Sequence, residues 1–266
     1  MAERRVRTAA LALPAFAGAL AALLLWALPD AALAGEVFAG QELRSVSAAP
    51  GSARQLWQTR QVGWSGLIWK SWSISGDVLE VRRFGQRAQE QTLRLDAPAS
   101  PGQAHWSLRL GTSQGAAFLP RNAAQVGWAQ AVGHGQVLHA EAGVEHYARQ
   151  TVYPLRMSLD HYVSCGYASL GLQVFESAGL PSAQSVWVQF VHLPASASQG
   201  MWQARLGYGR AFEALTNGVL EVGSGWSGFL RYRLPLANAW FFDATLARHA
   251  GLEAGESIAF TLGRTF

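Results

Sequence analysis

The stretch that decides the fold is residues 255–266, GESIAFTLGRTF, which ends on an aromatic residue. Successive side chains of an extended strand point to opposite faces, so Ile258, Phe260 and Leu262 share one face. The other face carries small and polar side chains, namely Ser257, Ala259, Thr261 and Thr265. One apolar and one polar face are typical of a strand between lipid and a lumen. We therefore expect a membrane-spanning β-strand, with Phe260, Leu262 and Phe266 as the candidate signal for barrel assembly.

The first 34 residues have the three parts of a secretory signal peptide. Three arginines among the first seven residues precede an uncharged apolar run, and Ala32 and Ala34 fit an A-x-A cleavage site. An uncleaved membrane anchor is the alternative, because the run approaches the roughly 20 residues that span a bilayer. Pro14 inside the run argues against that alternative, and the lack of a cysteine at the cleavage site argues against a lipoprotein. We expect export and cleavage near Ala34.

Composition and charge exclude several functional classes. The formal net charge is only +4 and no cluster of lysine and arginine follows the first 34 residues, so no nucleic-acid-binding surface is predicted. Cys165 is the sole cysteine, so an internal disulfide cannot form in an oxidising compartment. Apolar residues nevertheless make up 50% of the chain. A closed membrane barrel reconciles these facts, because it exposes every second side chain to lipid. A soluble β-sandwich or barrel is the alternative.

Short alternating segments recur along the chain, separated by Gly, Pro, Asn and Asp. Twelve strands are predicted, at residues 71–84, 87–95, 103–112, 121–131, 136–147, 151–163, 166–177, 184–193, 200–208, 220–234, 239–249 and 255–266. A tilted strand needs about 9 to 11 residues to cross a bilayer. If both chain ends lie in the periplasm, the number of spans must be even, which argues against counting a further strand near 55–63.

These segments predict an all-β protein, a transmembrane antiparallel up-and-down β-barrel of twelve strands after a cleaved signal peptide. The expected organisation is a signal peptide at 1–34, a periplasmic lead-in at 35–70 with at most a short strand near 55–63, and the barrel at 71–266. The expected location is the bacterial outer membrane. With Phe266 at the periplasmic rim, the connections alternate between the two sides, and none of the outer loops is long.

Charged residues of both signs recur on the polar faces of the predicted strands. An Arg or Lys on the lipid face would cost about 2 to 4 kcal/mol at mid-bilayer, so we assign the charges to the lumen. They are Glu80, Arg82, Glu90, Arg94, Arg109, Glu141, Glu145, Arg156, Asp160, Arg205, Glu221, Arg231, Arg233 and Asp243. Two interpretations stay open: the charges pair and fill the lumen, or they line a conducting passage. The segment 184–193 is ambiguous, because Trp187 and Phe190 point to opposite faces.

Several segments resemble the YaiO family of outer-membrane β-barrel proteins, over roughly residues 56–266. They are Val81-Arg82-Arg83-Phe84-Gly85, His105-Trp106-Ser107-Leu108, Phe118-Leu119-Pro120-Arg121, residues 137–147, Leu159-Asp160-His161-Tyr162 and the terminal hairpin 231–266. Their order and spacing carry the resemblance. It implies an outer-membrane barrel whose activity is not established. Some similar proteins look related to polysaccharide export and carry a helical-repeat domain before the barrel, which we do not expect here. Arg264 also departs from the aromatic residue that many barrels have at this position.

Chemistry inside the lumen is the main alternative to a plain barrel. His139, Ser158 and Asp160 are predicted to point inward from neighbouring strands, as a nucleophile triad would require. Packing of ordinary lumen residues explains the same set, and no G-x-S-x-G elbow is present. The histidines are scattered without an H-E-x-x-H motif, so no metal site is predicted. We therefore expect a protein that is not an enzyme and binds no cofactor.

Two classes of function follow from the sequence. The first is an integral outer-membrane β-barrel of structural or narrow-pore type, with an unknown substrate. The alternatives are an accessory to polysaccharide export and a lumen-site enzyme that modifies lipid or lipopolysaccharide. The expected partners are outer-membrane lipid and lipopolysaccharide, the barrel-assembly machinery and periplasmic chaperones. Small solutes or a polysaccharide are the candidate passing molecules.

Overall fold

The computed structural model describes residues 35–47, 54–68, 72–97, 104–196, 199–214, 219–251 and 254–266, so the predicted signal peptide at 1–34 lies outside the described residues. These ranges contain fourteen β-strands. The strands are β1 (Gly35–Ser47), β2 (Gln55–Ile68), β3 (Trp72–Arg83), β4 (Gln86–Asp96), β5 (His105–Gly115), β6 (Asn122–Gly133), β7 (Gln136–His146), β8 (Thr151–Val163), β9 (Gly166–Ser177), β10 (Ala183–His192), β11 (Met201–Ala214), β12 (Leu220–Pro235), β13 (Trp240–His249) and β14 (Ala254–Thr265). A short 3-10 helix, η2 (Ala237–Ala239), joins β12 to β13. No helix in this part of the chain has the length and apolar character that a membrane span requires.

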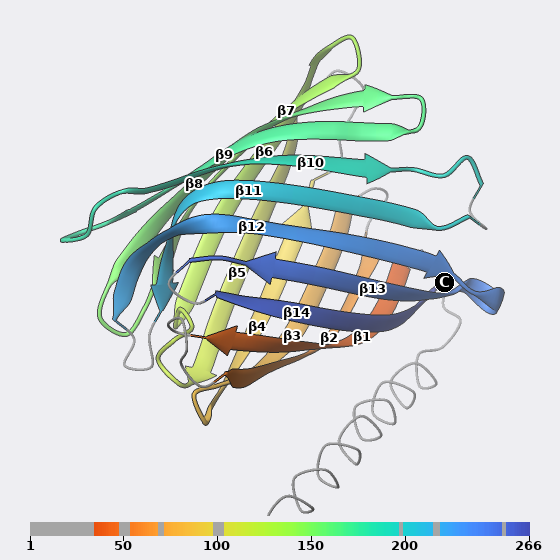
Figure 1. Cartoon of the computed structure of the whole chain (residues 1–266). Coiled ribbons are helices and arrows are strands. Elements are labelled where there is room, and N and C mark those ends of the chain that lie inside the picture. The colour runs from red at the N-terminus through yellow and green to blue at the C-terminus, as the bar shows by residue number, and fades with distance from the viewer. Residues whose placement is uncertain are drawn as a thin grey trace, which may run out of the picture.

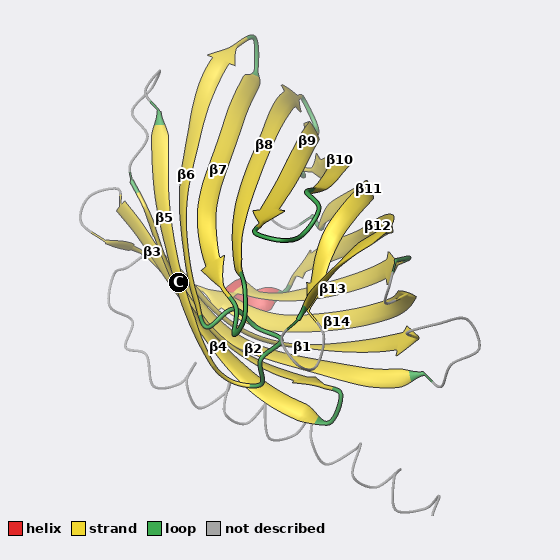
Figure 2. Cartoon of the chain, turned by 90° about the vertical axis from the view of Figure 1, so that its left-hand side faces the viewer, coloured by secondary structure: helices red, strands yellow, loops and turns green. Residues whose placement is uncertain are grey.

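The strands form one closed sheet. Each pairs antiparallel with its neighbours in sequence, and β1 pairs with β14 from Glu36↔Thr265 to Ser47↔Ala254. Figure 1 and the view turned by 90° in Figure 2 show the strands wrapped round in chain order. The antiparallel up-and-down barrel is therefore confirmed. We call the rim at Gly35 and Phe266 the terminal rim and the opposite one the distal rim.

The strand register separates an outer face from an inner face. Alternate residues carry large exposed apolar side chains, such as Leu170 (62% exposed) and Leu206 (56% exposed). Directly paired residues lie on the same side of a sheet, so the ladder carries this face round the whole barrel. A continuous apolar face suits lipid. On β14 it holds Ile258, Phe260 and Leu262, as the sequence predicts.

The prediction of twelve strands is wrong by two, because β1 and β2 are part of the barrel wall. The periplasmic lead-in predicted at 35–70 is therefore wrong for Gly35–Ser47 and Gln55–Ile68. The outer face is itself polar there, with Gln41 on β1 and Gln58 and Arg60 on β2, so the apolar alternation is weak. The parity argument is still met, since the two additional strands form one hairpin.

Tight turns connect several strands. At the distal rim, Phe84 (φ 54°) and Gly85 (φ 73°) both adopt left-handed backbone conformations, as a two-residue turn between twisted strands requires. At the terminal rim, His134 (φ 47°) and Gly135 (φ 73°) repeat this geometry between β6 and β7. Because these connections are short, most of the side chains that can line the lumen belong to the strands of the barrel wall.

Candidate functional site in the barrel lumen

Most of the predicted lumen charges lie on the inner face. The register places there Glu90, Arg94, Arg109, Glu141, Glu145, Arg156, Asp160, Arg205, Arg231, Arg233 and Asp243. Several are paired, as Arg156 Nη1 lies 3.7 Å from Glu141 Oε1. Whether these charges pair and fill the lumen or line a passage therefore depends on the partners of each side chain.

Two predicted lumen charges on β3, Glu80 and Arg82, lie on the outer face instead. They share that face with the exposed Val78. Apolar residues occur on both faces of β3, because Leu79 and Val81 point inward. Alternation alone therefore could not choose the correct face, and the assignment of Glu80 and Arg82 to the lumen is wrong.

β11 and β12 continue past the barrel wall as a two-stranded ribbon. β10 pairs with β11 only as far as Gly209, and β13 pairs with β12 only as far as Ser227. Residues 210–214 and 220–224 therefore pair only with each other. Glu221 belongs to this ribbon and is directly opposite Glu213, so it keeps the predicted side of its strand but lies beyond the barrel wall. The alternating pattern simply continues beyond the rim, which hides the end of the wall in the sequence.

The ribbon crosses the distal opening. The Leu220 backbone N–H donates to Gln150 Oε1 at 3.0 Å, which joins the start of β12 to the β7–β8 connection. Ala214 packs against a buried cluster around Phe118, a residue of the β5–β6 loop that is 2% exposed. Figure 1 shows β12 curving at its start across the end of the barrel. Contacts from opposite walls thus narrow this opening.

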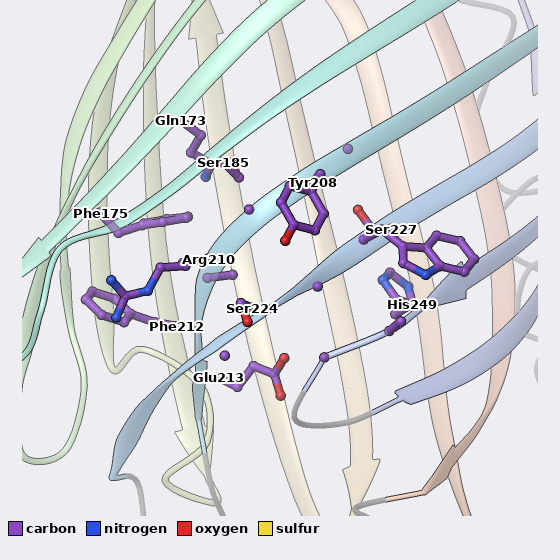
Figure 3. A pocket seen from close by; sticks show the side chains of 18 of the residues that line it. Gln173, Phe175, Ser185, Tyr208, Arg210, Phe212, Glu213, Ser224, Ser227 and His249 are labelled. Atoms are coloured by element: carbon purple, nitrogen blue, oxygen red, sulfur yellow. The ribbon is translucent and has the colours of Figure 1, made fainter.

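The ribbon lines a distal cavity of about 460 Å³. Figure 3 labels Arg210, Phe175, Phe212, Glu213 and His249 among the side chains around this cavity. Cationic side chains outnumber carboxylates around this cavity: Arg44, Arg83, Arg205 and Arg210 accompany Glu213. Fixed charge of one sign in a confined space attracts ions of the opposite sign. The residues that line the distal cavity thus include more cationic than anionic side chains.

Aromatic rings hold two of these arginines against the wall. The Arg83 guanidinium lies 4.6 Å from the centre of the Trp57 ring and 5.6 Å from that of Phe118. Arg44 lies 5.2 Å from the same Trp57 ring. Each contact of this kind is worth roughly 0.5 to 2 kcal/mol. These ring contacts hold both guanidinium groups at the wall of the distal cavity.

Tyr147 completes the distal cavity from the β7–β8 connection. Its hydroxyl donates to Glu145 Oε2 at 3.2 Å. Burial, together with the negative charge of Glu145, raises the pKa of the Tyr147 phenol far above its usual value. The phenol therefore stays neutral and remains a donor at physiological pH.

A second cavity, of about 440 Å³, lies toward the terminal rim and brings together the three residues considered as a triad. His139 Nε2 lies 3.1 Å from Asp160 Oδ2, and Ser158 is directly opposite His139 in the β7–β8 register. The two side chains are close enough for the carboxylate to orient the imidazole, although His139 Nε2 forms no hydrogen bond to a described residue. Among all the residues that the structure describes, no group of three or more His, Cys, Asp or Glu is arranged to hold a metal ion.

Trp187 and Arg205 lie where the two cavities meet. Trp187 lines both cavities, and the Arg205 guanidinium lies 4.2 Å from the centre of its ring. Gly171 makes room for the indole, because a Cβ at that position would contact the ring. Within the described ranges, Arg205 forms no ion pair. The ambiguity of this strand is thereby resolved: Trp187 points inward and Phe190 outward.

A cluster of paired charges lies near the terminal rim. Asp243 accepts hydrogen bonds from Arg231 Nη2 at 2.5 Å and from Arg233 Nε at 2.9 Å. Arg233 also reaches Glu36 Oε2 on β1, at 3.4 Å. The Asp243 side chain is only 4% exposed. This cluster joins β12 and β13 to β1 across the seam where the barrel closes, so its charges are engaged in holding the wall.

The sequence reasoning missed Arg44, Trp57 and Arg83. Arg44 and Trp57 belong to β1 and β2, the strands that were not predicted. Arg83 shares the inner face of β3 with Val81, and counting from that buried residue would have found it. Cys165, predicted in a turn at the terminal rim, is a free and exposed thiol.

Comparison with known proteins shows likeness in structure alone. No family model matches the chain, and no curated protein matches it. A bacterial polysaccharide outer-membrane secretin has a TM-score of 0.54 at 9% identity, covering 88% of this chain and 98% of that one. An outer-membrane channel from Pseudomonas putida F1 has a TM-score of 0.53 at 9% identity, covering 90% and 97%. The KdgM porin in complex with disordered oligogalacturonate has a TM-score of 0.51 at 5% identity, covering 87% and 99%.

The fold and these likenesses define the class of protein. The chain is an integral outer-membrane β-barrel protein, with a closed antiparallel wall, an apolar outer face and charged side chains inside. The predicted fold class and outer-membrane location are confirmed. At identities this low the shared fold does not define the molecule that the protein handles.

Proposed function

We propose that the protein is a narrow channel that passes small anionic solutes across the outer membrane. The observation that carries this proposal is Arg205, which lies on Trp187 between the two cavities and forms no ion pair within the described ranges. The distal cavity adds Arg44, Arg83 and Arg210. Cationic groups on low-dielectric walls focus the field and raise the local anion concentration.

The number of strands supports a lumen that side chains do not fill. A barrel of about eight strands is just filled by its own side chains, whereas porins of roughly 16 to 18 strands enclose an aqueous channel. Fourteen strands fall between these limits, and the lumen holds cavities of about 460 and 440 Å³. Cavities of this size suit a hydrated ion or a small organic anion.

Ion selectivity in planar bilayers tests the channel. In a potassium chloride gradient, the wild type is expected to give stable steps and a reversal potential that favours chloride. Arg205→Gln should lower the chloride-to-potassium permeability ratio, because it removes a fixed positive charge at the junction of the cavities. Arg248→Gln is the matched control, since that side chain lies on the outer face and is 66% exposed. A cation-selective wild type, or the same ratio in Arg205→Gln, would contradict the proposal.

We also propose that the chain belongs to the YaiO family and that its signal peptide is removed near Ala34. The ordered motifs from 81–85 to the terminal hairpin support the family, and the Ala32 and Ala34 pattern supports the cleavage site. The mass of the protein isolated from outer membranes should correspond to a chain beginning at Gly35. A retained N-terminal segment would contradict the cleavage, and motifs that fall on non-equivalent strands of family members would contradict the family.

Passage of a polysaccharide is a second candidate function. Two of the similar structures are a polysaccharide secretin and a porin in complex with oligogalacturonate, and this favours an acidic sugar chain as the passing molecule. The arginine and aromatic side chains of the distal cavity suit such a chain. Efflux of labelled oligogalacturonates of graded length from proteoliposomes tests it. Retention of every length by vesicles that pass chloride would leave small anions as the solutes.

We further propose that the protein is not an enzyme. The contact between His139 and Asp160 is the observation that favours the opposite view. Lipid or lipopolysaccharide hydrolysis by purified protein, lost in His139→Ala, would establish an enzyme and overturn this proposal.

A further inference from the structure

We propose that the outer face of β2–β5 binds a phosphorylated glycolipid of the outer leaflet, with its phosphates on an arginine cluster and an acyl chain in a groove below. This site lies on the lipid side of the wall, so it does not rest on the channel function of the lumen.

A charged patch interrupts the apolar outer face near the distal rim. Arg60, Glu80, Arg82 and Arg87 lie on one continuous outer surface of β2, β3 and β4, and Gln58 and Gln89 extend it. On β9 and β10 the outer face instead carries apolar side chains such as Leu172 and Val186. Charge facing lipid is costly at mid-bilayer and nearly neutral at the interface. The patch therefore belongs at the level of the lipid headgroups.

Two of the three arginines in this patch share one carboxylate. Glu80 Oε1 lies 2.9 Å from Arg82 Nε, and Glu80 Oε2 lies 2.5 Å from Arg87 Nη2. Both carboxylate oxygens are thus engaged. Arg60 is directly opposite Glu80 in the β2–β3 register, yet its Nε and Nη2 are buried with no hydrogen-bond partner in the described chain.

The patch consequently has two positive charges in excess and unused guanidinium donors. The planar donor fork of arginine matches the oxygens of a phosphate, and such charge-assisted hydrogen bonds are about twice as strong as neutral ones. The glutamines Gln58 and Gln89 supply both donors and acceptors to sugar hydroxyls beside the phosphate. The chemistry of this patch therefore fits a phosphorylated sugar.

An apolar groove of about 480 Å³ continues from the patch toward the terminal rim. Val62 and Val78, the next outer residues after Arg60 and Glu80, are among its lining residues. Gly76 opens the groove, because it has no side chain, and the indole of Trp64 borders that position: a Cβ there would lie 3.1 Å from Trp64 Nε1. A groove that is apolar and open to lipid suits an acyl chain.

The order of these two features along the barrel selects the occupant. With Gly35 and Phe266 at the periplasmic side, the arginines lie toward the outer leaflet and the groove toward the bilayer centre. A lipid in the site therefore has its phosphates outward and its tails inward. Lipid A, the phosphorylated acylated sugar of the outer leaflet, has this arrangement of groups.

Binding of bisphosphorylated, hexa-acylated lipid A to the full chain, purified in detergent free of lipopolysaccharide, tests the site. Native mass spectrometry should show one bound lipid A. The variant Arg60→Gln/Arg82→Gln/Arg87→Gln should bind it about tenfold more weakly or worse. Arg248→Gln, an outer-face arginine of β13, is the matched control and should bind like the wild type. Gly76→Leu fills the groove and should also weaken binding, with correct folding checked by heat-modifiable migration.

Four further outcomes would overturn the assignment. Equal binding of dephosphorylated lipid A would remove the role of the phosphates. Complete displacement of lipid A by millimolar inorganic phosphate would reduce the site to an anion site without lipid specificity. A dimer that is lost in the triple variant would identify the patch as a contact between two copies of the chain. Unchanged affinity in both the triple variant and Gly76→Leu would overturn the site altogether.

Discussion

Gly35 and Phe266 exchange two backbone hydrogen bonds, from Gly35 N to Phe266 O at 2.9 Å and from Phe266 N to Gly35 O at 3.0 Å. These bonds are at the terminal rim, at the end of the ladder between β1 and β14 that closes the barrel. An open sheet edge in lipid would leave backbone groups without partners, at a cost of several kcal/mol each. The last residue therefore takes part in barrel closure through its backbone as well as offering an aromatic ring.

Deletion of Phe266 is expected to impair assembly, because it removes both hydrogen bonds and the terminal aromatic residue. Outer-membrane fractions should then contain much less barrel with heat-modifiable migration in gels. Phe266→Tyr keeps the backbone and the ring and serves as the control. Normal amounts of folded barrel in the deletion would refute the role assigned to this residue.

Phe118→Ala should enlarge the distal opening. The substitution removes a side chain that is 2% exposed and packs with Val81 and Ala88, so it should destabilise the protein by about 3 to 5 kcal/mol and loosen the ribbon. Single-channel conductance should rise. Phe242→Ala removes an aromatic ring from the outer face and should leave the conductance unchanged. Wild-type conductance in folded Phe118→Ala would show that the ribbon does not limit flow.

Arg231→Glu should lower the stability of the barrel, and this effect should outweigh any change in ion selectivity. The new carboxylate would face Asp243, whose side chain is 4% exposed and already accepts from Arg231 and Arg233. Breaking a buried pair in this way costs about 3 to 5 kcal/mol. Urea titration of folded protein in micelles should show the loss. Arg231→Gln and Asp243→Asn should give less than additive losses when combined, and strict additivity would argue against coupling of this pair.

The contribution of Tyr147 to the stability of the protein is expected to fall at alkaline pH. Burial and Glu145 raise the pKa of this phenol in the folded protein above the ordinary value of 10.0. A raised pKa means that the folded state holds the proton more tightly, so the contribution is full below about pH 10 and falls as pH rises through the folded pKa. Tyr147→Phe should therefore be less stable than the wild type at pH 8 by about 1 kcal/mol, with the difference shrinking above pH 10. A constant difference from pH 8 to 11 would contradict this assignment.

The barrel could be predicted from the sequence wherever the outer face is apolar. In β14 the alternation of Ile258, Phe260 and Leu262 with small residues identifies both strand and faces. In β1 and β2 the same period is present, but polar residues such as Gln41 and Arg60 occupy the outer face, and a hydrophobic pattern cannot reveal them. The polar outer surface that hid these strands is also the surface proposed to bind lipid.

The lumen could be predicted only in part, because pairing and crossing contacts are set by three-dimensional register. Alternation placed Arg205 and Arg231 on one face, yet it could not show that Arg231 is paired and that Arg205 is not. The crossing of the ribbon depends on contacts between residues far apart in the chain, such as Leu220 with Gln150. Sequence spacing carries no signal for such contacts.

Gly171→Val should narrow the channel without preventing assembly. A Cβ at this position would contact the Trp187 indole, so the ring must move away from the wall and into the space between the two cavities. Valine is well accepted in strands, so the folded barrel should persist. Conductance should fall, and Trp187→Ala added to Gly171→Val should restore it, because the displaced ring is then absent. Gly228→Ala, at an outer-face glycine of β12, is the control and should leave conductance unchanged. A reduced conductance that Trp187→Ala fails to restore would place the limiting neck away from Trp187.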